Sequence, residues 1–140
     1  MKEFKIDLEP KVLTNEGIEK ELLITLQKIE FFSNNLLHLN RKKIELKYLI
    51  DKEKFKIMYE VSKEEIKLEN SLPKKKYTNE NARNAETMRR LTEIPIVKDW
   101  NKNLEENNEE LEETKLEVEK EDRMYKALKA ICYLRGSYKL

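Results

Sequence analysis

A heptad-like spacing of side chains in the carboxyl-terminal third of the chain limits the possible folds more than any other feature. Steps of four and three residues connect Trp100, Leu104, Asn107, Leu111, Thr114, Val118, Glu121, Tyr125, Leu128 and Cys132. In an α-helix these steps bring all ten side chains onto one face, which favours packing against another helix. Because Asn107, Thr114 and Glu121 make one heptad position polar, we expect this helix, over residues 97–135, to need an apolar neighbour.

The first half of the chain supplies a suitable neighbour. Thr14, followed by Glu16 in the first turn, is typical of a helix start, and no proline follows until Pro73. This predicts a long helix over residues 15–71. Its apolar residues recur at helical spacing and include Ile18, Leu22, Leu26, Ile29, Phe32, Leu36, Ile50, Ile57, Val61 and Leu68. Polar residues interrupt the spacing at Asn40, Lys43 and Lys47. One continuous helix and two stacked helices both fit, and we favour a break between residues 33 and 43.

A short basic helix is expected between the two long ones. Pro73 and the three lysines after it form a connection, and Thr78 to Asn81 repeats the helix-start pattern. This helix, over residues 78–93, ends because Pro95 disfavours a helical conformation at the preceding residue. The segment from 73 to 96 is long enough for the last helix to return antiparallel to the first. Gly136 is expected to cap the last helix.

Together these elements predict an all-α fold in a single domain, residues 1–140. We expect an elongated antiparallel coiled-coil helical hairpin with a short connecting helix. Only two glycines and three prolines, with 41% charged residues, agree with a helical chain. The residues before the first helix, 1–13, alternate at Phe4, Ile6 and Leu8 as in a short strand. An extended arm packed on the helices is favoured over an edge offered to a partner strand.

Charge is distributed unevenly along the chain. Residues 41–98 hold 16 basic and 10 acidic residues, whereas residues 101–124 hold 4 basic and 10 acidic residues. The favoured interpretation is that the acidic helix lies along the basic one and that opposite charges flank the apolar seam. In the functional interpretation the basic stretch binds nucleic acid while Tyr77 or Tyr48 stacks on a base. The basic candidates are Arg41, Lys42, Lys43, Lys74, Lys75, Lys76, Arg83, Arg89 and Arg90.

The acidic part of the last helix is a second candidate surface. Its partner-binding candidates are Glu105, Glu106, Glu109, Glu110, Glu112 and Glu113. Such a surface can imitate the charge of nucleic acid and occupy the basic groove of a partner. Acid-base or metal chemistry is a weaker interpretation, because carboxylates on one exposed helix normally form a solvated face.

No catalytic residue, metal ligand set or cofactor site is predicted. His38 and Cys132 are each the only residue of their type, which excludes an internal disulfide and a multi-cysteine zinc site. Phosphate-binding glycine loops and nucleophile elbows are also missing. The longest apolar runs are far shorter than the roughly 20 residues of a membrane span. We therefore expect a non-enzymatic, cytoplasmic protein that does not bind a membrane.

Residues 75–135 show a resemblance to a group of phage proteins. The stretch from Thr78 to Ala85, followed by an acidic helix that ends in a hydrophobic and basic turn, carries the resemblance. The chain is similar to small helical accessory proteins that phages and prophages encode beside single-strand annealing recombinases. The resemblance implies a cytoplasmic accessory protein in a bacterial host, acting around DNA recombination, replication or host nucleases. Arg83 is the one residue that it carries over.

Three functions follow as hypotheses. The first is a phage-encoded interaction protein that binds a protein of nucleic-acid metabolism or bacterial defence, as a recombination accessory or an inhibitor. The second is direct binding of single-stranded nucleic acid by residues 41–98. The third is a homo-oligomeric coiled-coil spacer, in which two hairpins join through the polar-diluted seam and Asn107 helps to set the register.

Overall fold

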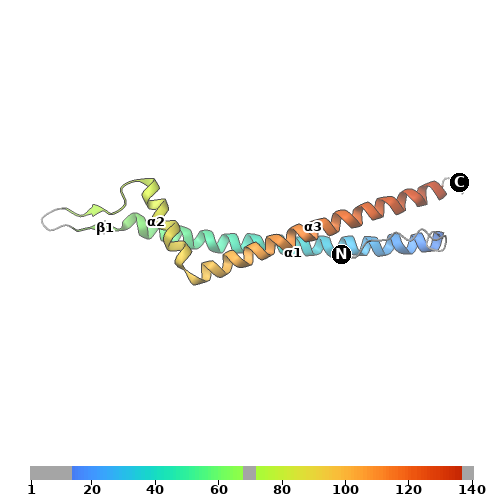
Figure 1. Cartoon of the computed structure of the whole chain (residues 1–140), viewed down its shortest axis with the longest axis horizontal. Helices are drawn as coiled ribbons and strands as arrows, with labels where there is room; N and C mark the ends of the chain where they lie inside the picture. Colours follow the sequence, from blue (N-terminus) through green and yellow to red (C-terminus); the bar gives the residue numbers. More distant parts are fainter. Residues whose placement is uncertain (1–13, 68–71, 137–140) are drawn as a thin grey trace. The chain divides into compact units, whose positions relative to one another are not determined.

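The protein is mainly helical in a computed structural model that describes residues 14–67 and 72–136. Two long helices, α1 (Asn15–Lys63) and α3 (Pro95–Gly136), pack together, and a shorter helix, α2 (Glu80–Glu93), precedes α3 (Figure 1). Two short strands, β1 (Glu65–Ile66) and β2 (Lys74–Lys75), lie between α1 and α2. The all-α prediction is confirmed. The expected arm, residues 1–13, lies outside the described residues.

Helix α1 begins as predicted but is not broken. The Oγ1 atom of Thr14 accepts a hydrogen bond from the backbone N–H of Gly17 at 3.0 Å, which caps the first turn. The helix then continues to Lys63 without interruption, so the predicted break between residues 33 and 43 is wrong. Leu39 and Leu46 are buried in this part of the helix, whereas Asn40 and Lys47 are exposed. The apolar face of α1 therefore continues through Leu39 and Leu46, which directly precede these two polar residues.

Helix α1 ends at Lys63, well before the predicted end at residue 71. Glu65 and Ile66 instead pair antiparallel with Lys75 and Lys74, and the backbone N–H of Lys76 donates to the carbonyl oxygen of Glu64 at 2.9 Å. These bonds come from residues about ten positions further along the chain. They replace the helical hydrogen bonds that would have extended α1, because each backbone group needs one partner.

Helices α2 and α3 have clear local starts. The side chain of Asn79 accepts a hydrogen bond from the backbone N–H of Ala82 at 2.7 Å, so α2 begins two residues after the predicted position. Ile94 is extended and ends α2, as the following proline requires. Pro95 is itself the first residue of α3, two residues before the predicted start, because the first helical position needs no backbone N–H donor. Gly136 is the last residue of α3.

The contacts divide the chain into two units. The second unit comprises Leu39 to Glu110 and contains the core where α1, α2 and α3 meet. Ile57, Val61, Leu91 and Val97 are buried there, and partly buried neighbours surround them, namely Ile50, Tyr77, Ile94 and Trp100. Asn107 of α3 also donates a hydrogen bond from Nδ2 to the carbonyl oxygen of Leu39 in α1. This core fixes α2 on the end of α1.

The first unit contains the start of α1 and the end of α3, from Leu111 onward. Its buried side chains are partly polar, with Thr25, Thr114 and Glu121 beside Ile18 and Leu111. The heptad positions of α3 are all buried or half-buried, as the spacing predicts. The polar positions face α1 of the same chain: Nδ2 of Asn35 lies 3.5 Å from Oγ1 of Thr114, and Nζ of Lys28 lies 3.9 Å from Oε1 of Glu121. In the first unit these two polar positions are therefore covered by α1 of the same chain.

Candidate functional site

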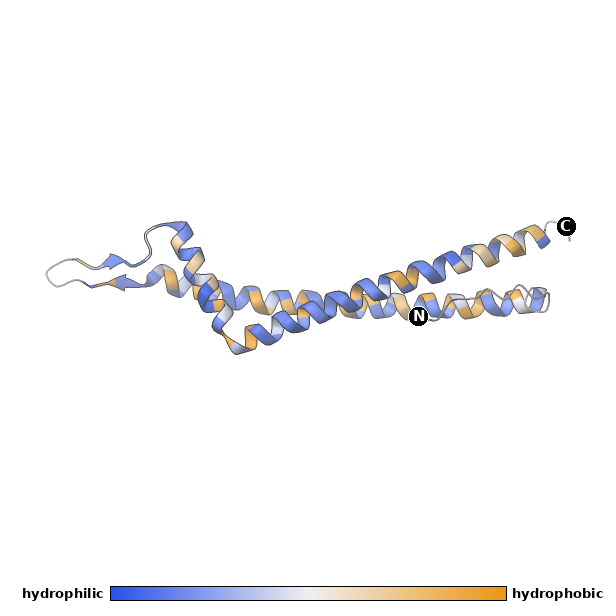
Figure 2. Cartoon of the chain, in the orientation of Figure 1, coloured by the Kyte–Doolittle hydropathy of each residue, from blue (hydrophilic) through white to orange (hydrophobic). Residues whose placement is uncertain are grey.

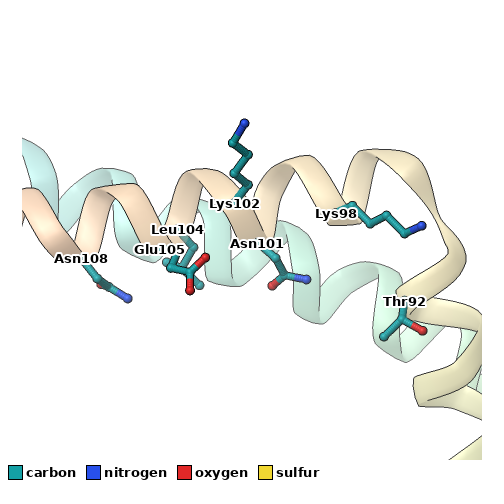
Figure 3. A pocket seen from close by; sticks show the side chains of 7 residues that line it. All are labelled: Thr92, Lys98, Asn101, Lys102, Leu104, Glu105 and Asn108. Carbon is teal, nitrogen blue, oxygen red and sulfur yellow. The ribbon is translucent and has the colours of Figure 1, made fainter.

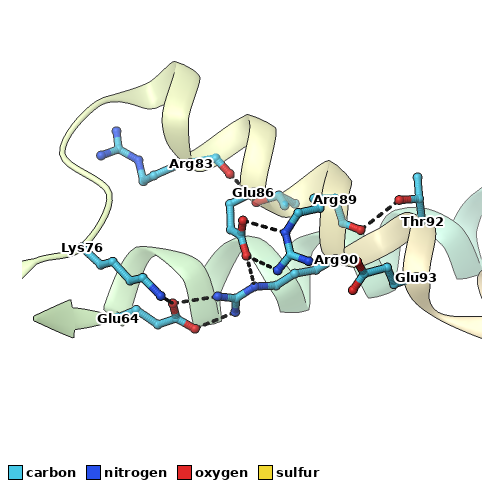
Figure 4. Close-up of polar contacts among 9 residues, drawn as sticks. Glu64, Lys76, Arg83, Glu86, Arg89, Arg90, Thr92 and Glu93 are labelled. Carbon is cyan, nitrogen blue, oxygen red and sulfur yellow. Dashed lines mark hydrogen bonds and ion pairs between the residues drawn. The ribbon is translucent and has the colours of Figure 1, made fainter.

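Two arginines predicted to bind nucleic acid are held in an ion-pair network of the second unit. Arg90 of α2 bonds both carboxylate oxygens of Glu64, at 2.6 and 2.7 Å, and Oε1 of Glu86 at 2.7 Å (Figure 4). Arg89 bonds Glu86 at 2.7 and 3.0 Å and Glu93 at 2.9 Å. Two arginines thus share three carboxylates, and their fork geometry is satisfied within the protein. Arg90 therefore links α2 to Glu64, next to the end of α1, whereas the contacts of Arg89 lie within α2.

Glu86 is the centre of this network. Its side chain is 13% exposed, and hydrogen bonds from Arg89 and then Arg90 lower the pKa of its carboxyl group to about 2. The same contacts with Glu86 raise the pKa of both guanidinium groups. Each partner therefore stabilises the charged form of the other.

Lys76 and Arg83 also have partners within the second unit. Nζ of Lys76 lies 3.9 Å from Oε2 of Glu64 and 5.5 Å from the ring centre of Tyr77. Nη1 of Arg83 donates to the carbonyl oxygen of Tyr77 at 3.4 Å. Because the Tyr77 ring packs against the core, it is poorly placed to stack on a base. Tyr48, the other stacking candidate, is 64% exposed on α1.

The remaining basic candidates do not form one patch. Arg41 and Lys42 are exposed on α1 and Lys43 is half-buried there, whereas Lys74 and Lys75 are exposed on β2. Strand β2 pairs with residues that directly follow the end of α1. At a rise of ~1.5 Å per residue, roughly 30 Å of helix separates Lys42 from that end. The structure therefore places the predicted nucleic-acid residues in two separate groups.

The acidic candidates all lie exposed on α3. Glu105, Glu106, Glu109 and Glu110 belong to the second unit, and Glu112 and Glu113 follow on the same helix in the first unit. Glu112 pairs with Lys115 at 3.4 Å. No ion pair between described residues joins the basic stretch, 41–98, to the acidic stretch, 101–124. Three basic residues of the basic stretch pair with acidic residues of the same stretch: Lys76 and Arg90 with Glu64, and Arg89 with Glu86 and Glu93.

A shallow depression lies beside the first of these glutamates (Figure 3). It is lined by Thr92, Lys98, Asn101, Lys102, Leu104, Glu105 and Asn108. Lys98, Lys102 and Glu105 are the charged residues of this lining, and Oδ1 of Asn108 is buried without a hydrogen-bond partner. The depression offers polar contacts at the edge of the acidic surface.

A row of exposed apolar side chains on α1 is absent from the sequence predictions. Ile44, Tyr48, Phe55 and Tyr59 are 61–67% exposed in the second unit, and we call them the α1 stripe. Steps of four and seven residues keep them on one side of the helix. Hydrophobic residues recur along α1 in Figure 2, and the same periodicity could have revealed a second apolar face.

The single histidine and cysteine lie apart from these surfaces. His38 is exposed on α1, and Cys132 is half-buried on α3 beside a small depression formed with Asn15, Glu19 and Arg135. Among the described residues, no group of three or more His, Cys, Asp or Glu side chains is placed to hold a metal ion.

Within residues 14–67 and 72–136, no helix combines the length and the apolar character needed to cross a bilayer. Comparison with known proteins gives no match to a family model, a curated protein or a solved structure.

Proposed function

We propose that the chain is a non-enzymatic helical interaction protein, encoded by a phage and active in the bacterial cytoplasm. Its partner is a protein of nucleic-acid metabolism or bacterial defence, which it assists as a recombination accessory or inhibits. The sequence resemblance over residues 75–135 supports the phage context. The partner would be bound by α3 through Glu105, Glu106, Glu109 and Glu110.

The scaffold in this proposal is an antiparallel coiled-coil hairpin. Contacts of the first unit support it, because residue numbers rise along α1 as they fall along α3. The pairs are Asn15 with Arg135, Lys28 with Glu121, and Asn35 with Thr114. The burial of the heptad positions of α3 gives further support. A rigid helix of this kind would present its outward side chains in a fixed order.

One observation carries the proposed binding surface: the exposed glutamates of α3 in the second unit keep their charge unneutralised, while Arg89 and Arg90 of the basic stretch are paired elsewhere. Arg89 and Arg90 bond to Glu64, Glu86 and Glu93. The four glutamates of the second unit form no ion pair with a described residue, and all are exposed. A concentrated acidic face raises the association rate with a basic groove, and salt weakens this attraction.

A capture experiment with matched variants tests the proposal. The full chain is immobilised and incubated with bacterial lysate, with and without nuclease treatment, and captured proteins are identified by mass spectrometry. The captured protein is then purified, and its affinity is measured for the wild type and for E105Q/E106Q/E109Q/E110Q. We expect a nuclease-resistant partner whose affinity falls about tenfold or more in the variant and falls with added salt.

The control removes the same number of charges elsewhere. Glu19, Glu21, Glu30 and Glu60 are exposed on α1, and E19Q/E21Q/E30Q/E60Q should bind as the wild type does. Equal loss in both variants would assign the effect to net charge and reject the α3 surface. Capture that disappears with nuclease would reject a direct protein partner.

A second candidate function is direct binding of single-stranded nucleic acid by Lys74 and Lys75. Their side chains are exposed on β2 next to Lys76, which supports a local basic contact. Mobility shifts of labelled single strands at low salt test it. K74E/K75E should abolish a shift that R89E leaves, because Arg89 already bonds Glu86 and Glu93. A shift unaffected by K74E/K75E would reject this site.

A further inference from the structure

The α1 stripe lies on the side of the helix opposite to its packed side. Leu39, Leu46, Ile57 and Val61 are buried toward the other helices of the second unit. Counting 100° per residue, these four positions centre roughly 165° away from the α1 stripe. The helix is therefore apolar on two sides, and only one of them is covered within the chain. Three of the four exposed stripe residues are aromatic, as is typical of protein interfaces.

A groove continues the stripe toward α2. Asp51, Lys54, Phe55 and Met58 of α1 line it on one side, and Asn84, Thr87 and Met88 of α2 line it on the other. Met88 is 47% exposed beside Phe55. The groove and the stripe thus join at Phe55, and together they can receive a helix that lies along α1.

We propose that this surface binds a second copy of the same chain, with the two α1 helices antiparallel. In this arrangement Ile44 of each copy enters the groove beside Phe55 of the other. Two stripes whose aromatic side chains are about two-thirds exposed would bury roughly 1,000 Å² in total, which reaches the lower limit of a specific interface. The acidic residues of α3 proposed above take no part in this contact.

The charges beside the stripe favour a second copy as the occupant. In an antiparallel pair related by a two-fold axis, each flank of one helix meets the same flank of the other. Lys47 and Asp51 share one flank, being four residues apart, and Glu45 and Lys52 share the other, being seven apart. All four are exposed, and none forms an ion pair with another described residue.

The same register satisfies the apolar and the charged contacts. It brings Lys47 to Asp51, Glu45 to Lys52 and Ile44 to Phe55 of the other copy. The midpoints of these pairs all lie between residues 48 and 50, so one two-fold axis accounts for the three of them.

Sedimentation equilibrium of the full chain over a range of concentrations tests the proposal. The wild type should form dimers, and I44S/F55S should remain monomeric with the helix content of the wild type by circular dichroism. These side chains are exposed in the single chain, so their replacement leaves its core intact. A wild type that stays monomeric up to millimolar concentration would overturn the proposal and leave the stripe to a different protein or to a lipid surface.

Charge reversal tests the register. D51K and K47D should each raise the dimer dissociation constant about tenfold, because each turns two attractive contacts into repulsive ones. The double variant K47D/D51K restores opposite charges and should dimerise as the wild type does. A dimer that is insensitive to I44S/F55S, or a double variant no better than the single ones, would overturn the proposed antiparallel contact.

Discussion

Nδ2 of Asn107 donates a hydrogen bond of 2.9 Å to the carbonyl oxygen of Leu39, which joins α3 to α1 inside the second unit. Asn107 is 3% exposed, and its Oδ1 atom is buried without a hydrogen-bond partner. A buried amide that satisfies only half of its bonding capacity costs stability. It also disfavours other helix registers, because a shifted helix would leave the whole amide unpaired.

Replacing Asn107 by Leu should therefore stabilise the fold. Removal of an unsatisfied buried oxygen and burial of apolar surface should raise the free energy of unfolding by about 1–2 kcal/mol. Urea denaturation followed by circular dichroism measures this change. N107A leaves a cavity and should be less stable than N107L. A denaturation midpoint of N107L below that of the wild type would show that the amide contributes net stability.

The network around Glu86 predicts a dependence of stability on pH. Its carboxyl pKa is lowered from 4.5 to about 2 in the folded protein, so the unfolded chain binds the proton more tightly. The stabilising contribution of Glu86 is complete above pH 4.5 and is lost as the pH falls toward about 2. The urea midpoint of E86Q should consequently fall less than that of the wild type between pH 5 and pH 2.

The control for this effect is Glu105, which is exposed and forms no ion pair with a described residue. E105Q should retain the pH dependence of the wild type. If E86Q and E105Q showed the same slope of midpoint against pH, the Arg89 and Arg90 contacts would not stabilise the fold in solution.

Leu91 should be essential for holding α2 on α1. It is 5% exposed and packs with Ile57, Val61 and Val97. L91A should lower the free energy of unfolding by about 2–4 kcal/mol, because it removes buried methyl groups and leaves a cavity. M88A, on the exposed side of the same helix, should change it by less than about 1 kcal/mol. Thermal unfolding of both variants measures these changes. Equal losses of stability in L91A and M88A would contradict the observed orientation of α2.

The cap of α2 gives a smaller, local prediction. Oδ1 of Asn79 accepts the N–H of Ala82 at 2.7 Å, so N79A should destabilise the protein by about 1 kcal/mol. N81A provides a comparison, since Asn81 is an exposed residue within the first turn. Amide hydrogen exchange should show faster exchange at Ala82 in N79A than in N81A. Unchanged protection in N79A would mean that tertiary contacts alone hold the helix start.

Local patterns predicted much of the fold because they depend on near neighbours. Thr14 and Asn79 each cap a helix with a side-chain oxygen, and the backbone donors they bond are three residues away. The heptad of α3 predicted its buried face, including polar Asn107 and Thr114, because helix periodicity alone selects a face. The predicted break in α1 is wrong because the apolar face does not pass through Asn40. It continues through Leu39 and Leu46, which are buried.

Charge partners were the part of the candidate site that the sequence left undetermined. Arg90 and Glu64 are 26 residues apart and meet because α2 packs on α1. Because Arg90 pairs with Glu64, it is not available to neutralise the glutamates of α3. The opposite net charges of the two stretches had suggested such neutralisation. A count of charges along the chain cannot distinguish these outcomes, since an ion pair depends on distance in space.

The sequence by itself determined the helical class, the helix starts and the inward face of α3, because hydrogen bonds and side-chain periodicity within a helix are local. Only the tertiary structure decided that α1 ends at Lys63, where β1 pairs with β2, and that Glu86 binds two arginines. It also decided which apolar face of α1 is covered. Both faces have helical spacing, and burial depends on which of them the rest of the chain packs against.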